Sequence, residues 1–280
     1  MDYYILDSGN CRKLEKVGPW TIIRPCAQAI WSPSCNKETW RQAAAEFIRD
    51  SSGKGAWKFF NKKLPQRWQI NLQSIKVWTE LTAYGHLGFF PEHHQHAQTL
   101  INYLKGRKQK KILNLFAYTG VTSLILANTG IEITHVDASK ASIDWAKENA
   151  KLQPAQSKTR WILDDVMKFC KKEIRRGNKY DGIIVDPPSF GRGPKGELWK
   201  KDNQIKELLY NLKEIISKEF FILFTSHSPG YTPIVLSNLL DEITTSYKGK
   251  IQSNEMYLIE KHSKRKLPCG TYALFCNYNL

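Results

Sequence analysis

The stretch Tyr180-Asp-Gly-Ile-Ile-Val-Asp186-Pro-Pro-Ser-Phe190 joins an apolar run to an acid, two prolines and, one residue later, an aromatic ring. Adjacent prolines donate no backbone hydrogen bonds and hold φ near one value, so they end the strand and form a rigid loop. The carboxyl edge of an α/β sheet is where ligands bind. We expect the carbonyls of Pro187 and Pro188 to point outward as unpaired acceptors for the polar edge of a flat base, while Phe190 stacks on its face. The alternative is an ordinary turn that ends a strand.

Similar apolar runs, each followed by a helical stretch, continue through the chain from about Gly85. They cover residues 111–116, 131–136, 161–163, 183–185 and 220–224. This alternation predicts a parallel, doubly wound α/β sheet. The preceding residues are rich in Trp, Pro and short β-like runs, and residues 251–280 read as a terminal hairpin. We therefore expect a small β-rich domain over residues 1–84 and an α/β domain over residues 85–280.

The formal net charge of +16 favours a polyanionic partner, and nucleic acid is the leading candidate. The longest apolar runs are far shorter than a bilayer span, and the N-terminus carries Asp2 and Asp7 where a signal peptide is basic and then apolar. We expect a cytoplasmic protein. The six cysteines form no Cys-x-x-Cys pair, so we expect reduced thiols.

The turn after the first run of the sheet contains a single glycine, Gly120. Three glycines are typical where a backbone must close on a pyrophosphate, whereas a cofactor without phosphates needs one close approach. The sequence therefore favours S-adenosylmethionine over NAD. Asp137, at the end of the second run, is placed to accept hydrogen bonds from ribose hydroxyls, and Asp164 or Asp165, after the third, from an adenine amino group.

Each of these acids has a structural alternative. Asp137 could cap the helix that starts near Ser139, and Asp164 or Asp165 could cap the helix over residues 166–176. Their order and spacing, together with the Asp-Pro-Pro-x-Phe loop after the fourth run, favour a cofactor site.

The segments from Asn114 to Thr122, from Val136 to Ser139 and from Asp186 to Glu197 resemble those of class I S-adenosylmethionine-dependent methyltransferases, and in particular the bacterial large-subunit (23S) ribosomal RNA methyltransferase family. The resemblance implies a Rossmann-like seven-stranded sheet whose last strand is antiparallel. It also implies S-adenosyl-L-methionine as cofactor and ribosomal RNA as substrate.

The resemblance and the positions of residues at strand ends together predict which residues form the site. The expected cofactor residues are Phe90, Glu92, Phe116, Tyr118, Thr119, Gly120, Asp137, Ser139, Asp164, Asp165 and Asp186, with Phe90 and Glu92 closing over the pocket. The expected catalytic residues are Asp186, Pro187, Pro188 and Phe190.

The positions of the cysteines reduce the number of candidate atoms for methylation. Methylation of pyrimidine carbon 5 requires a cysteine that adds to the ring. No thiol follows Asp186 or the end of the fifth run at Thr225–Ser228, so a nitrogen target is favoured. Cys269 and Cys276, in the terminal hairpin, read as small apolar residues. His227 could take up the proton released from an amine, or could hydrogen-bond the neighbouring loop.

The histidines at positions 86, 93, 94 and 96 resemble a metal cluster but lack a partnering Cys or Asp at ligand spacing, so we expect no metal. Most basic clusters, including Lys200 and Lys201, read as solvated helix faces. Arg192 and Lys195 follow Phe190 in a glycine-rich loop, where an RNA phosphate would pass. Two rival functions stay open: methylation of a protein or small molecule, and a non-catalytic RNA-binding module on the same fold.

Overall fold

The computed structural model describes residues 2–50, 55–106, 110–153 and 158–278. They form two compact units, the first made of Met1–Glu92 with Tyr257–Cys269 and the second of His93–Met256 with Gly270–Leu280. The boundary expected after residue 84 lies eight residues before the end of Met1–Glu92. The sequence also did not predict that Tyr257–Cys269, in the C-terminal hairpin, belongs to the first unit. The assignment of separate tasks to residues 1–84 and 85–280 remains a prediction.

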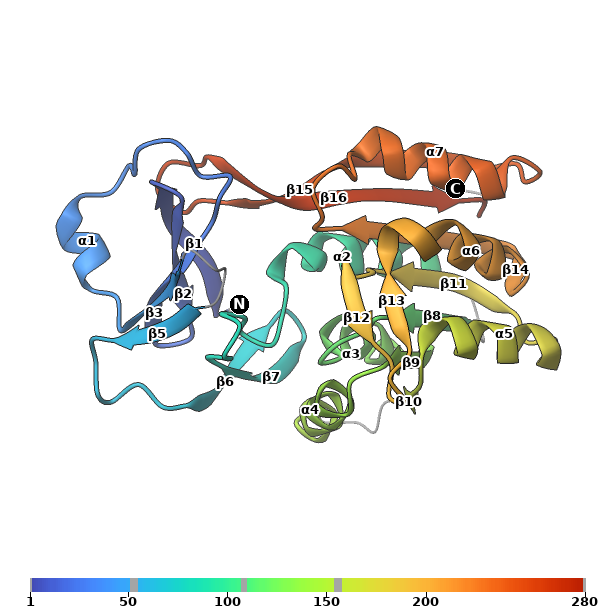
Figure 1. The fold of residues 1–280 in the computed structure, drawn as a ribbon, viewed down its shortest axis with the longest axis horizontal. Coiled ribbons are helices and arrows are strands. Elements are labelled where there is room, and N and C mark those ends of the chain that lie inside the picture. Colours follow the sequence, from blue (N-terminus) through green and yellow to red (C-terminus); the bar gives the residue numbers. More distant parts are fainter. Residues whose placement is uncertain (1, 51–54, 107–109, 154–157, 279–280) are drawn as a thin grey trace. The chain divides into compact units, whose positions relative to one another are not determined.

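The first unit is rich in β-structure, as the sequence predicted (Figure 1). Its larger sheet has the order β1-β2-β3-β4-β5, in which β3 and β4 run parallel and the other neighbours antiparallel. These strands are β1 (Tyr3–Gly9), β2 (Arg12–Val17), β3 (Trp20–Pro25), β4 (Ala45–Arg49) and β5 (Gly55–Phe59). A hairpin of β6 (Arg67–Leu72) and β7 (Ile75–Glu80), the helix α1 (Lys37–Arg41) and the short η1 (Pro91–His93) complete the N-terminal segment.

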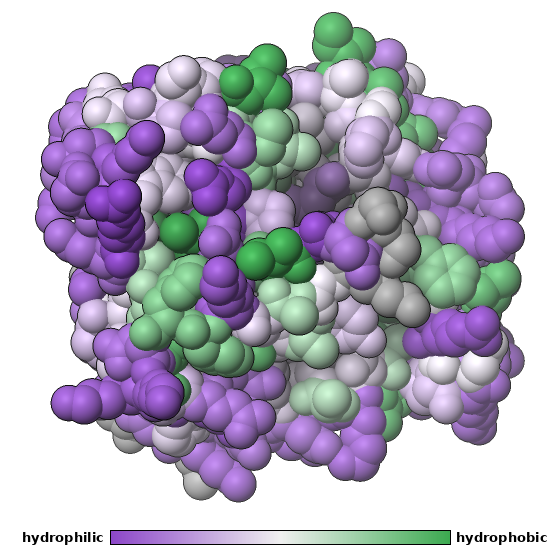
Figure 2. All heavy atoms as spheres, turned by 60° about the vertical axis from the view of Figure 1, so that its left-hand side comes forward, coloured by the Kyte–Doolittle hydropathy of each residue, from purple (hydrophilic) through white to green (hydrophobic). Residues whose placement is uncertain are grey.

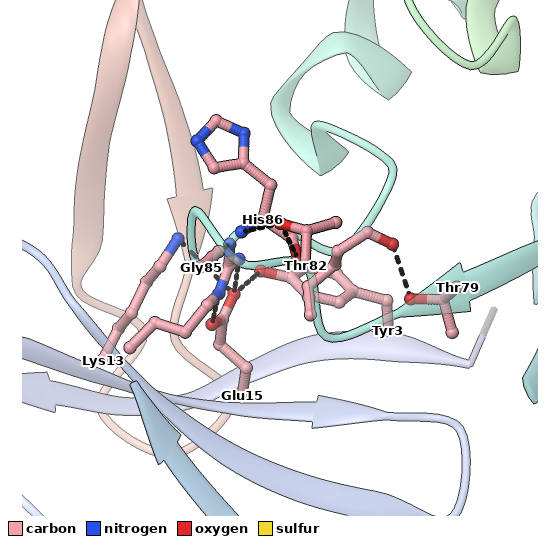
Figure 3. Close-up of polar contacts among 9 residues, drawn as sticks. Tyr3, Lys13, Glu15, Thr79, Thr82, Gly85 and His86 are labelled. Carbon is pink, nitrogen blue, oxygen red and sulfur yellow. Dashed lines mark hydrogen bonds and ion pairs between the residues drawn. The ribbon is translucent and has the colours of Figure 1, made fainter. Parts of the chain in front are cut away.

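A buried ion pair ties this sheet to the loop after β7 (Figure 3). The Glu15 carboxylate accepts hydrogen bonds at 2.6 Å from the Arg24 guanidinium and from the Tyr3 hydroxyl, and Lys13 lies 3.4 Å away. Arg24 also donates to the carbonyl of Gly85 at 3.0 Å. Burial by itself would raise the pKa of Glu15, but Arg24 and Lys13 lower it to about 2. The loop that leads to Phe90 is thus attached to the sheet through a charged group.

The second unit contains a seven-stranded sheet of order β10-β9-β8-β11-β14-β16-β15, the arrangement that the resemblance implied. Its strands are β8 (Lys111–Leu115), β9 (Glu132–Asp137), β10 (Thr159–Leu163), β11 (Tyr180–Val185), β14 (Ile216–Ser226), β15 (Lys250–Ile259) and β16 (Lys266–Cys276). β8, β9, β10, β11 and β14 are parallel, and β16 runs antiparallel to β14. Strands β8 and β11 lie at the centre, so the loops that follow them are neighbours.

Helices cover both faces of this sheet (Figure 1). They are α2 (His94–Leu104), α3 (Val121–Ala127), α4 (Lys140–Lys151), α5 (Val166–Arg176), α6 (Lys201–Lys213) and α7 (Pro233–Thr244). Apolar residues of α5, α6 and α7 share one core cluster, and those of α2 and α3 share another with the opposite side chains of the strands. Gly182 in β11 is closely packed, because a Cβ there would lie 2.2 Å from the Phe221 ring.

Hydrophilic residues cover most of the face that Figure 2 shows, with apolar residues in smaller groups between them. In the part of the chain that the structure describes, every helix is too short or too polar to cross a lipid bilayer.

Candidate active site

The loop after β8 has an unusual backbone. Phe116 and Tyr118 are non-glycine residues with positive φ, at 54° and 52°, and Gly120 follows with φ 83° as the N-cap of α3. Left-handed φ is costly for residues with a Cβ and is concentrated at functional sites. Gly120 is also closely packed, because a Cβ there would lie 3.0 Å from the Cβ of Ala146. The glycine expected for its close approach to a cofactor is therefore already required by its own backbone and neighbours.

Asp137 joins the loops that follow β8 and β9. Its Oδ2 accepts the backbone N–H of Tyr118 and its Oδ1 that of Ser139, each at 2.8 Å. Burial raises the pKa of Asp137, and these backbone hydrogen bonds act against that rise. The side chain that caps α4 is Ser139, which accepts from the backbone N–H of Ser142 at 3.2 Å. The capping alternative thus describes Ser139, whereas the Asp137 carboxylate is held rigidly at the sheet edge, where ribose hydroxyls are expected.

The two acids after β10 have structural partners. Asp165 is the N-cap of α5 and accepts from the backbone N–H of Lys168 at 2.9 Å. Asp164 accepts from the Asp165 N–H at 3.0 Å and pairs with Lys172 at 2.6 Å. The capping alternative holds for Asp165, and a contact of either acid with adenine remains a prediction.

Phe90 and Glu92 belong to the first unit. Phe90 packs edge-to-face on His86 at 5.5 Å between ring centroids, and Glu92 is buried. In the second unit, Thr119 is also buried, and its carbonyl accepts from the side chain of Asn149 at 3.0 Å. The expected roles of all three residues at the cofactor remain predictions.

Asp186, directly after β11, lies between two histidines. His93 Nε2 is 3.2 Å from its Oδ2 and His227 Nδ1 is 3.3 Å from its Oδ1, and the two imidazole centroids are 5.5 Å apart. Burial by itself would raise the pKa of Asp186, but His227 and His93 hold it well below its usual range. The result is a carboxylate that stays ionised at the position expected for the reaction.

The contact of His93 with Asp186 was not predicted. The sequence showed only a histidine-rich segment before α2, and we compared that segment with a metal site. Instead, His93 joins Asp186 and His227, whose ligand atoms all lie within 4.8 Å of one another. These atoms could hold a divalent cation. An imidazole nitrogen lies within 3.3 Å of each carboxylate oxygen, and the expectation of no metal remains a prediction.

The loop after Asp186 continues into a hairpin of β12 (Phe190–Arg192) and β13 (Leu198–Lys200). The expectation of an unpaired proline carbonyl is wrong for Pro188, because its oxygen accepts from Trp199 Nε1 at 2.7 Å. The Trp199 ring also lies 4.9 Å from the ring of Phe116. Trp199 of β13, which the sequence did not single out, therefore contacts both the loop after β11, through Pro188, and the loop after β8, through Phe116. Pro187 is buried and Phe190 is 52% exposed, and the expected contacts of both residues with a base remain predictions.

Arg192 and Lys195 are both exposed in this hairpin. The backbone N–H of Lys195 donates to Glu197 at 2.8 Å, and Glu197 also pairs with Lys168. The expected contact of these two cationic side chains with a substrate phosphate remains a prediction.

All six cysteines are free, as predicted, and burial raises the pKa of the Cys269 thiol.

Lys201 departs from the prediction of a solvated helix face. It is 1% exposed at the start of α6, where its ammonium donates to the hydroxyls of Ser226 at 2.8 Å and Ser228 at 2.5 Å. The ammonium also lies 4.2 Å from the ring centroid of Tyr231. Burial lowers the pKa of Lys201 to about 8, against the opposing effect of Asp186 and Asp202. A lysine in a basic run carries no sequence signal for such burial.

Comparison with known proteins places this chain in a family. The model of S-adenosylmethionine-dependent methyltransferases matches residues 49–246. A SAM-dependent methyltransferase structure from Agrobacterium tumefaciens is 37% identical, with a TM-score of 0.94 over 99% of this chain and 91% of that one.

Two curated relatives match over shorter regions. Ribosomal RNA large subunit methyltransferase K of Neisseria meningitidis is 27% identical over 195 residues, which are 69% of this chain and 50% of the relative. Ribosomal RNA large subunit methyltransferase K/L of Pseudoalteromonas atlantica is 32% identical over 154 residues, which are 54% of this chain and 21% of the relative. The chain spans half or less of these relatives' length. It belongs to the S-adenosylmethionine-dependent methyltransferase family, as the resemblance of its motifs predicted.

Proposed function

We propose that this protein transfers the methyl group of S-adenosylmethionine to a nitrogen of a base in ribosomal RNA, in the cytoplasm. The observation that carries the proposal is the ionised Asp186 between His93 and His227, followed at once by two prolines and an exposed aromatic ring. An ionised carboxylate accepts hydrogen bonds and donates none. It therefore suits a target with N–H groups, such as an exocyclic amine.

The residues at the sheet edge fit the cofactor. Asp137 is fixed by two backbone N–H groups, and its remaining lone pairs can accept from ribose hydroxyls. The loop from Phe116 to Gly120, with its left-handed backbone, lies beside Asp137 because the Tyr118 N–H donates to that carboxylate. When bound, S-adenosylmethionine supplies a methyl group on an already activated sulfonium leaving group.

The protein's own contribution is to place and orient the nucleophile. Phe190 stacks on the base while Asp186 accepts an N–H from the nitrogen that reacts. An exocyclic amine must lose one proton after methylation. In its neutral form, His93 or His227 can donate its N–H to Asp186 and receive that proton on its other ring nitrogen. A ring nitrogen such as guanine N7 loses none, so the two nitrogen targets differ in their need for these imidazoles.

Three observations support ribosomal RNA as the substrate. The formal charge is +16, both curated relatives described above are named ribosomal RNA methyltransferases, and Arg192 with Lys195 extends the basic surface beside Phe190. A protein or small-molecule acceptor would leave this charge unexplained. A non-catalytic RNA-binding module would have no need of the Asp137 and Asp186 arrangements.

The test is transfer of labelled methyl from S-adenosylmethionine to total RNA from a strain that lacks the gene, followed by digestion to nucleosides. We expect label in one N-methylated nucleoside, loss of that label with Asp186→Ala, and full labelling with Asp144→Ala, an exposed carboxylate of α4. Label in 5-methylcytidine would overturn the nitrogen target. Binding of S-adenosylhomocysteine without label on RNA, but with label on protein or a small molecule, would overturn the RNA substrate. Failure to bind S-adenosylhomocysteine would favour the non-catalytic module.

A further inference from the structure

Lys201 begins a chain of hydroxyl groups that ends at the surface beside the Asp-Pro-Pro loop. Its ammonium donates to Ser228 Oγ at 2.5 Å, and Ser228 Oγ lies 2.7 Å from Ser189 Oγ. Ser189 is exposed and stands between Pro188 and Phe190, and its carbonyl accepts from the backbone N–H of Lys201 at 3.0 Å. The buried ammonium is thus connected to the substrate-facing loop through one intervening hydroxyl.

The direction of this chain follows from the hydrogen-bonding capacity of its members. An ammonium only donates, and each hydroxyl has one hydrogen to give. With its lone pair facing the ammonium, Ser228 directs its hydrogen toward Ser189, because a charged donor polarises the hydroxyl that accepts from it. The Ser189 oxygen is then engaged as an acceptor, so its own hydrogen is left for a group outside the protein.

We propose that Lys201 is a positioning residue that orients the Ser228 and Ser189 hydroxyls, so that Ser189 presents a hydrogen-bond donor to an acceptor atom of the target base. This inference rests on the proposed function, because it assigns the recognition of the base at the same site. Asp186, three residues earlier, can only accept. The loop then reads a base edge that carries an N–H donor beside an acceptor atom, as the edges of adenine, cytosine and guanine do.

The surroundings hold Lys201 in this role. Two of its three N–H bonds point to Ser226 and Ser228, and the face of the Tyr231 ring occupies the remaining side of the ammonium. The Tyr231 hydroxyl in turn donates to Asp202 at 2.7 Å. The Lys201 side chain is buried, and its ammonium contacts these partners without turning toward solvent.

Loss of the proton from Lys201 removes the fixed direction of the hydrogen bonds from Lys201 through Ser228 to Ser189. A neutral amine can accept from Ser228, so the direction of these hydrogen bonds can reverse. The charged and titratable groups around it are Asp186 after β11, Asp202 on α6 and Tyr231 before α7, with His93 and His227 beyond Asp186. Burial lowers the pKa of Lys201 to about 8, so reversal falls between pH 7 and pH 9. Imidazoles titrate between about pH 5 and pH 8 and overlap the lower part of this window, so the comparison of the Lys201 variants with the wild type is what isolates the lysine.

The test compares methyl transfer to the RNA by the full chain and its variants between pH 7 and pH 9. For the wild type we expect kcat/KM to fall as pH rises through about 8. Ser189→Ala and Lys201→Met should lower kcat/KM at pH 7 by roughly 5- to 10-fold, the value of one hydrogen bond, and should lose the fall above pH 8. Lys201→Gln keeps a donor to Ser228 without a titrating charge, so it should retain most activity at pH 7 and give a flat profile.

Lys206→Met, an exposed lysine of the same helix paired with Glu242, is the matched control and should behave as the wild type. Equal profiles for the wild type and the three site variants would overturn the inference while leaving the proposed function intact. No transfer by the wild type would count against the proposed function instead. In that case, NMR titration of the lysine side chains remains decisive, because Ser228→Ala should lower the pKa of Lys201, and an unchanged value would refute the hydroxyl chain.

Discussion

At the scale of single residues, Asp186 keeps its charge in a confined position because an imidazole faces each of its oxygens. A buried carboxylate without such partners would take up a proton instead. The histidines come from the start of α2 and the end of β14, far from Asp186 in the chain. The site therefore depends on contacts between side chains of different elements as well as on the motif itself.

The same three residues permit a test of the expectation that no metal is needed. Treatment with EDTA should change methyl transfer by no more than about twofold, because the sulfonium leaving group needs no Lewis acid and transfer depends on positioning. The measurement is labelled-methyl transfer before and after chelation, with added Zn²⁺ as control. Loss of activity that Zn²⁺ restores in the wild type, and not in His93→Gln, would reassign the cluster as a metal site.

At the scale of elements, the sheet of the first unit is built around a charged group in its interior. Glu15 of β2 is fully buried, and its partners lie on β1, β2 and β3, with Gly85 attached through Arg24 (Figure 3). Removal of one partner from such a cluster leaves an uncompensated buried charge, which is strongly destabilising. The cluster thus stabilises one register of these strands together with one position of the loop before Phe90.

The pKa of Glu15 predicts how stability depends on pH. Because folding lowers this pKa from 4.5 to about 2, the contribution is fully present above pH 4.5 and is lost as pH falls toward 2. We expect the wild type to lose roughly 3 kcal/mol of unfolding free energy across that window from this group. Urea unfolding at pH 7, 4 and 2.5 measures it.

Glu15→Gln should be less stable than the wild type at pH 7, and the difference should shrink in acid. Glu38→Gln, an exposed carboxylate of α1, should follow the wild type at every pH. A constant difference between Glu15→Gln and the wild type from pH 7 to pH 2.5 would contradict the ionised state of Glu15.

At the scale of the whole molecule, 42 basic residues against 26 acidic ones create a field that attracts polyanions. Many of the basic residues pair with acids, such as Lys168 with Glu197 and Lys172 with Asp164, and these pairs contribute little net charge. Arg192 and Lys195 differ because they lie in the hairpin that follows Phe190.

The double variant Arg192→Ala with Lys195→Ala should weaken RNA binding and reduce the slope of log K against log salt by about 1.5, the value for two lost phosphate contacts. Affinity for S-adenosylhomocysteine should not change, because neither side chain belongs to the cofactor residues. Filter binding at several salt concentrations checks the slope, with Lys147→Ala plus Lys151→Ala on α4 as the charge-matched control. An unchanged slope in the hairpin variant would remove this loop from the RNA contacts.

The sheet and the ends of its strands could be predicted from the sequence because their signals are local. Apolar runs bounded by Gly120, Asp137 and Asp186 indicate parallel strands, and the carboxyl ends of such strands meet at one edge. The sequence offers several candidate capping side chains near the start of each helix and does not choose between them. The hydrogen bonds identify Ser139 and Asp165 as the side chains that cap their helices.

The sequence by itself determined that this chain forms a doubly wound sheet, and it predicted a ligand site at the carboxyl edge of that sheet, since periodicity and strand-ending residues act over a few positions. The tertiary structure alone decided that His93 and His227 contact Asp186. It also decided that Trp199 donates a hydrogen bond to the carbonyl of Pro188, and that Lys201 is buried with its ammonium bonded to Ser226 and Ser228. These contacts join residues from different elements, and their energies depend on distance and desolvation, which exist only after the helices have packed on the sheet.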